Sequence, residues 1–174
     1  MKENNRIIAI CLISIIVITI LAFIPSKKAI VFDPFEGKEK LAFIPIQGET
    51  GFKMKYTHSI HLSDVVESYK LTPDKQIQQY ELMYKDFAIG MPANAEEGET
   101  FQQKDGNYYI KGMRRVFPYI ILRIGQVRAN HTVIYKQQEY PLSQFIKPGT
   151  PVRIEFRKLN FFQAWRGVNI LESK

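Results

Sequence analysis

Residues 52–59 read Phe-Lys-Met-Lys-Tyr-Thr-His-Ser, and they indicate the fold class because apolar and polar side chains alternate along them. A period of two is typical of a β-strand with one buried face, since successive side chains of a strand point to opposite sides. Phe52, Met54, Tyr56 and His58 therefore share the face that we expect to be buried.

Other short segments repeat this pattern, and turn residues separate them. Residues 65–72 and 76–84 alternate in the same way, and Pro73-Asp74-Lys75 between them predicts a hairpin turn. Residues 29–40 form a stalk or a first strand, and Pro45 makes 41–47 an edge strand. Helical turns are expected at 144–146 or 161–165. Further strands are expected at 107–111, 119–124, 131–135 and 152–158. About eight short strands predict a mainly β fold, either an antiparallel β-sandwich or a small barrel.

An apolar run precedes the β pattern. Ile7 to Ile24 holds 18 residues without a charge, and a helix of that length is about 27 Å long, close to the ~30 Å hydrocarbon core of a bilayer. A cleaved signal peptide is one alternative, but its apolar region is ~7–15 residues long and ends at a small-x-small site, which residues 21–29 do not supply. Lipidation at Cys11 is another alternative, but Ile10 stands where lipoprotein processing needs a small residue. We therefore expect an uncleaved transmembrane helix.

The charges that flank the run predict its orientation. Lys2 and Arg6 favour an N-terminus inside the cell, whereas Lys27 and Lys28 oppose it. A short basic tail before a first apolar segment usually stays inside. We expect a single-pass protein of the cell membrane, with residues 1–28 as a signal-anchor and residues 29–174 as an extracytoplasmic β domain.

Composition excludes several classes of function. The 174-residue chain has one Cys, so it forms no intramolecular disulfide and no multi-Cys metal site. Four of its 24 Lys and Arg and one of its 17 Asp and Glu lie in residues 1–28. The remainder carries a formal charge of only +4, which does not indicate a nucleic-acid-binding protein.

The densest group of reactive side chains is Tyr56-Thr-His58-Ser59-Ile-His61-Leu-Ser63. Adjacent residues of a strand face opposite ways, so His58 and Ser59 form no dyad unless the strand breaks there, and no nucleophile elbow is present. We expect no enzyme activity. A small surface hydrolase that uses His58 with Ser59 or Ser63 is the alternative.

A metal site and a polar wall are two further interpretations of the same group. His58 and His61 diverge on a strand, and a third ligand would have to be Glu67 or His131, so we expect no metal and no cofactor. If residues 60–64 form the turn, His58 lies opposite residue 66 or thereabouts, within hydrogen-bonding reach of Glu67. Such a pair either satisfies itself in the core or recognises a ligand or partner.

Three short motifs resemble those of a bacterial family catalogued as domain of unknown function eighteen-fifty. The match covers about residues 50–158, although Ala88 stands where the first glycine of the last motif is usual and Val65 replaces a common proline. The motifs are Tyr-Thr-His58-Ser59, Val66-Glu67-Ser-Tyr69 and Phe-Ala-Ile-Gly90-Met-Pro92.

The resemblance implies a role in solute uptake. Members are small anchored or exported proteins, commonly encoded beside the fused permease and solute receptor of TAXI-type TRAP transporters. It implies an accessory or interaction subunit of such a transporter, with a TRAP-type permease or solute receptor as the partner and His58, Ser59, Glu67, Gly90 and Pro92 as motif positions. A structural envelope protein without a ligand is the remaining alternative.

Overall fold

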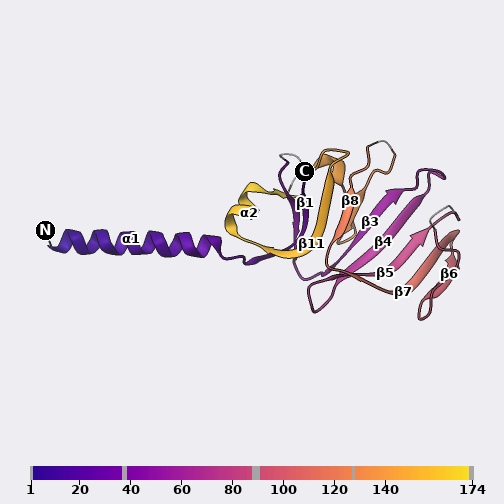
Figure 1. The fold of residues 1–174 in the computed structure, drawn as a ribbon, viewed down its shortest axis with the longest axis horizontal. Helices are drawn as coiled ribbons and strands as arrows, with labels where there is room; N and C mark the ends of the chain where they lie inside the picture. Colours follow the sequence, from indigo (N-terminus) through magenta and orange to yellow (C-terminus); the bar gives the residue numbers. More distant parts are fainter. Residues whose placement is uncertain (1, 37–38, 88–90, 127, 173–174) are drawn as a thin grey trace.

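Two β-sheets and one long N-terminal helix make up the computed structural model, which describes residues 2–36, 39–87, 91–126 and 128–172 (Figure 1). The first sheet, sheet A, has five strands in the order β12 (Val168–Asn169), β2 (Ala42–Pro45), β1 (Lys27–Pro34), β11 (Pro151–Leu159) and β8 (Ile120–Arg123). The second sheet, sheet B, has seven strands in the order β10 (Gln138–Pro141), β9 (Thr132–Tyr135), β3 (Gly51–Thr57), β4 (Asp64–Leu71), β5 (Ile77–Tyr84), β7 (Asn107–Phe117) and β6 (Thr100–Lys104).

The two sheets pack face to face, so the predicted mainly β, antiparallel sandwich is confirmed. Every strand pair is antiparallel except β12 with β2, and the described strands form no closed barrel. One apolar cluster fills the space between the sheets. It joins Ile30 and Phe156 of sheet A to Phe52, Tyr69 and Val133 of sheet B. This burial of apolar surface stabilises the sandwich in place of disulfides.

The stretch expected to be a stalk or a first strand is the central strand of sheet A. Ile30 and Phe32 of β1 face the main core, while Ala29 and Val31 face the other side of the sheet, and all four are fully buried. Helix α2 (Phe161–Arg166) covers that other side, which explains why β1 shows a continuous apolar run rather than an alternation.

The three alternating segments form neighbouring strands β3, β4 and β5, as predicted. Met54 lies opposite Glu67, which in turn lies opposite Leu82, so these side chains share the inner face of sheet B. A bulge at Tyr80 shifts the register of β5 against β4 and β7.

Some local expectations differ from the structure. Pro45 ends β2, but β2 is not the edge strand, because the two-residue β12 pairs with its outer side. The helical turn at 161–165 is confirmed by α2, whose N-terminus is closed by a capping box between Asn160 and Gln163. A 3₁₀ turn spans Leu142–Gln144.

Helix α1 (Lys2–Phe23) projects from the sandwich along the longest axis of the molecule (Figure 1). Its segment Asn4–Phe23 has a mean hydropathy of 2.8, and its most apolar stretch contains no buried residue. A helix of this length and composition is long enough to cross a bilayer, and a signal sequence has the same character. Strands β3 to β7 lie on the side of the molecule away from α1 (Figure 1).

Candidate functional site

Three loops meet at one end of sheet B, and they carry most of the sequence-predicted site residues. Strand β3 ends and β4 begins at loop 58–63, and loop 85–99 follows β5 at the same end, since Val65 lies opposite both Tyr56 and Tyr84. Loop 124–131 joins them, because the Thr57 amide donates a hydrogen bond to the Ala129 carbonyl at 2.9 Å. We call this the loop end of sheet B.

Loop 58–63 is a tight reversal built around His58. The His58 amide donates to the Ser63 carbonyl at 2.8 Å, and the Leu62 amide donates to the His58 carbonyl at 3.0 Å. The Ile60 amide donates to His58 Nδ1 at 3.3 Å, so a neutral imidazole carries its proton on Nε2. Ser59 is exposed in this loop. Among the described residues, no serine hydroxyl hydrogen-bonds to a histidine.

Glu67 does not meet His58. The turn occupies 58–63 rather than 60–64, so Glu67 lies opposite Met54 and His58 lies beyond the last residue pair of the hairpin, Thr57 with Asp64. The predicted register was therefore wrong, because the strand stops one residue before His58 and the chain reverses there.

Glu67 instead pairs with a tyrosine on its own strand. Tyr69 is two residues away on the same face, and its hydroxyl donates to Glu67 Oε2 at 2.5 Å. Burial raises the pKa of the Glu67 carboxyl, and the hydrogen bond from Tyr69 opposes that rise. Burial and then the Glu67 charge raise the pKa of Tyr56, on the neighbouring strand, to about 12.

The position of this pair explains its chemistry. Tyr69 and Met54 belong to the core between the sheets, whereas Val65 and Leu82 belong to a separate apolar cluster nearer the loop end. Glu67 lies between the two clusters, where a carboxylate without a donor would be costly. The arrangement is that of a satisfied polar contact beneath the loop end.

Loop 85–99 is held to the sheet by aromatic packing and one hydrogen bond. The buried Tyr84 hydroxyl donates to the Pro92 carbonyl at 2.5 Å. Phe87 packs on Tyr108 with ring centroids 4.2 Å apart, and Phe101 lies 6.2 Å from Phe87. Gly90 and Ala88, two positions of the family motif, lie outside the described residues.

The histidines of the loop end lie in separate surroundings. The His58 and His61 rings are 6.0 Å apart in loop 58–63. His131 is half-buried, its Nδ1 accepts from the Gly125 amide at 2.9 Å, and burial lowers its pKa. In residues 2–36, 39–87, 91–126 and 128–172, no group of three His, Cys, Asp or Glu is placed to hold a metal ion.

The loop end exposes apolar side chains that the sequence patterns did not single out. Ile60 and Leu62 stand out from loop 58–63, and Phe87 is half exposed on the next loop. Ile60 and Leu62 are 60% and 58% exposed, and Phe87 is 48% exposed. The available sequence signal was the pair of apolar residues in this turn, Ile60 before His61 and Leu62 after it.

The fold and the loop end of sheet B define the class of protein. It is a two-sheet antiparallel β-sandwich that follows one apolar helix and has a candidate site on its loops. A family model described as a domain of unknown function, DUF1850, matches residues 52–142. Because this match covers more than half of the chain, the protein belongs to that family. Neither a curated protein nor a solved structure matches the chain.

The family match follows the structure closely. Residues 52–142 contain all seven strands of sheet B, apart from the first residue of β3, together with β8. The range predicted from the sequence motifs, 50–158, is longer than this match and also includes most of β11. The remaining strands of sheet A, and both α-helices, lie outside the match. The loop end therefore lies within the family domain.

Proposed function

We propose that this protein is a membrane-anchored, extracytoplasmic accessory subunit of a TAXI/TRAP-type solute transporter, without enzyme activity. In this proposal α1 holds the chain in the membrane and the loop end of sheet B binds the permease or the solute receptor. The observation that carries it is the exposure of Ile60, Leu62 and Phe87 at a loop end built on strands that lie away from α1 (Figure 1).

Features at the base of α1 support the membrane attachment. Phe23 of α1 packs on Phe162 of α2 with ring centroids 4.9 Å apart. Trp165 and Phe161, on the same short helix, are 74% and 61% exposed. Aromatic side chains beside an apolar helix are typical of the boundary between bilayer and water. We infer that α2 lies in the headgroup region.

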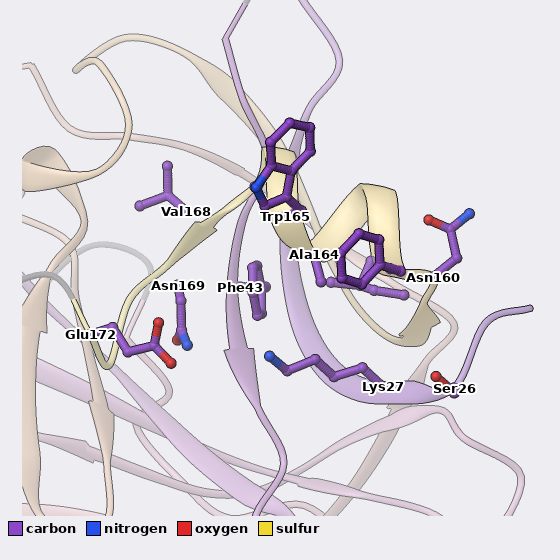
Figure 2. Close-up of a pocket in the computed structure, with 12 residues that line it drawn as sticks. Ser26, Lys27, Phe43, Asn160, Ala164, Trp165, Val168, Asn169 and Glu172 are labelled. Carbon is purple, nitrogen blue, oxygen red and sulfur yellow. The ribbon is translucent and has the colours of Figure 1, made fainter. Parts of the chain in front are cut away.

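Figure 2 shows this region around a cavity of about 640 Å³. Trp165 projects from α2, and Lys27, which follows α1, reaches under the Phe43 ring with its ammonium 5.2 Å from the ring centroid. A cation at this level would meet lipid phosphates. The anchor would also confine the domain to the membrane plane and raise its effective concentration near a permease.

Co-purification from the native membrane tests the proposed partner. The tagged full chain is compared with a variant carrying Ile60→Asp and Leu62→Asp. Leu62 has a φ of +56°, which Asp tolerates better than Leu, so the change does not add backbone strain. We expect the wild type to recover a TRAP-type permease or receptor, and the double variant to recover at least tenfold less.

Ile121→Asp is the matched control. Ile121 is 58% exposed, like Leu62, but lies on β8 of sheet A. We expect this variant to recover the partner as the wild type does. Absence of any TRAP-type subunit above the level of an untagged strain would contradict the proposal and favour the structural envelope protein.

A further inference from the structure

A second cavity, of about 690 Å³, opens between the two sheets at the opposite end of sheet B from the loop end. Its walls come from the start of β1, the end of β11 and the turn between β4 and β5. We call it the basic cavity. Its volume is within the ~300–1,000 Å³ of ordinary small-molecule sites. Lys28, on its rim, is five residues beyond the end of α1.

Uncompensated positive charge surrounds the mouth of the basic cavity. Lys28 of β1 lies directly opposite Lys158 of β11, and Lys75 approaches from the β4–β5 turn. Like charges directly opposite each other on paired strands destabilise a sheet. Within the described part of the chain, no acidic side chain lines this cavity and none of the three ammonium groups has an ion-pair partner.

Arg157 also lines the basic cavity, but its charge is already compensated. Its Nη2 lies 2.6 Å from Asp33 Oδ2, and its Nη1 lies 3.4 Å from Glu155 Oε1. The free charge of the mouth is therefore that of the three lysines.

The inner wall of the cavity is apolar. Phe156 belongs to the core between the sheets, and Ile46, which follows β2, and Leu71 of β4 pack against that core. Lys28 is exposed, lines the cavity and shares a face of β1 with Ile30, which is also in the core. A lysine at such a position can cover apolar surface with its stem and keep its ammonium in water. An anionic head at the mouth and an apolar body inside would satisfy both parts of the site.

We propose that the basic cavity binds an amphiphilic anion, with a carboxylate or phosphate head held by Lys28, Lys75 and Lys158 and an apolar chain against Ile46, Leu71 and Phe156. A membrane lipid and a free solute have this chemistry in common. The inference goes beyond the proposed function and does not depend on a transporter partner.

Lysine footprinting of the full chain in phosphatidylcholine nanodiscs tests the site. Acetylation of each lysine is measured by mass spectrometry while octanoate is titrated, with 1-octanol as the uncharged probe of equal chain length. We expect octanoate to protect Lys28, Lys75 and Lys158, 1-octanol to protect none of them, and Lys104 on β6 to be unaffected by either.

A charge-removing variant tests the role of the paired lysines. In Lys28→Gln with Lys158→Gln, the octanoate concentration that half-protects Lys75 should rise by about fivefold or more, since each such charge contact contributes a factor of a few. The control pair Lys104→Gln with Lys147→Gln should leave it unchanged. An unchanged value in the first variant, with its circular dichroism spectrum intact, would overturn the proposal.

The source of the anion is distinguished by the lipid. Protection of the three lysines in nanodiscs that contain phosphatidylglycerol, without octanoate, identifies a membrane lipid, and protection by octanoate alone identifies a free solute. Protection by neither would overturn the proposal. No transporter is present, so this failure is separate from failure of the proposed function.

Discussion

Replacement of Tyr69 by Phe tests the buried contact beneath the loop end. The change removes the hydroxyl that donates to Glu67 at 2.5 Å and keeps the ring that stacks on Phe52 with centroids 5.2 Å apart. A hydrogen bond to a buried charged group contributes about 1.5–3 kcal/mol, so we expect the free energy of unfolding at pH 8 to fall by about 2 kcal/mol.

The loss should depend on pH, with a definite sign. Burial raises the pKa of Glu67 above its unfolded value, and removal of the Tyr69 donor raises it further. The stability that the neutral Glu67 carboxyl contributes is complete below its pKa in the unfolded chain, about 4.3. This stability is lost as the pH rises through the pKa of Glu67 in the folded state. At pH 4 the carboxyl is largely neutral and only an uncharged hydrogen bond is lost, about 1 kcal/mol.

The assay is urea unfolding of the β domain in the nanodisc-bound chain, followed by circular dichroism at pH 4 and pH 8. Tyr84→Phe is the matched control, because its hydroxyl donates to the Pro92 carbonyl rather than to an acid. We expect about 1 kcal/mol at both pH values for that control. Equal losses of unfolding free energy at pH 4 and pH 8 for Tyr69→Phe would contradict this prediction. So would a double variant, Tyr69→Phe with Glu67→Gln, whose loss is the sum of the two single losses.

Three further predictions concern the turn, the sheet and the membrane face. Gln137→Gly should raise the free energy of unfolding in urea by about 0.5–1 kcal/mol, because Lys136 and Gln137 both have positive φ (49° and 64°) in the turn between β9 and β10. The control Gln138→Gly, within β10, should lower the free energy of unfolding. Gly51→Ala should cost about 1–3 kcal/mol, since its Cβ would lie 2.9 Å from the Tyr69 carbonyl, and the exposed Thr50→Ala should change stability by less than ~0.5 kcal/mol. Trp165 is the one tryptophan of the chain, so its fluorescence should be quenched in nanodiscs with brominated phosphatidylcholine, and unchanged emission would contradict membrane contact by α2.

Strands with one buried face were predictable from the sequence, and those with another environment were not. Alternation revealed β3, β4 and β5 because their inner residues meet the core. Strand β6 was missed because all five of its residues are exposed, so no apolar period exists. Its hairpin signal was the Asp105-Gly106 turn, where both residues have positive φ. Residues 29–40 were predicted as a stalk or a first strand, and alternation did not decide between the two because β1 is buried on both faces.

The face of β4 on which Glu67 lies was predictable from the sequence, but the contacts of Glu67 were not. Glu67 and Tyr69 were correctly placed on one face by their spacing of two, yet their pairing was overlooked in favour of Glu67 with His58. That error came from the turn, since the reversal at His58 rests on backbone hydrogen bonds that no residue type in 58–63 signals. The position of the loop end relative to α1 depends on how the two sheets pack on each other. The alternation of apolar and polar residues along a strand does not predict that packing.

Site-specific photocrosslinking in native membranes tests the proposed docking surface most directly. A benzoylphenylalanine is placed at position 62 of loop 58–63 in one sample and at position 121 of β8 in another, and the adducts are identified by mass spectrometry. We expect an adduct with a TRAP-type permease or solute receptor from position 62 and none from position 121. Equal adducts from both positions, or none from position 62 in the anchored chain, would contradict that expectation.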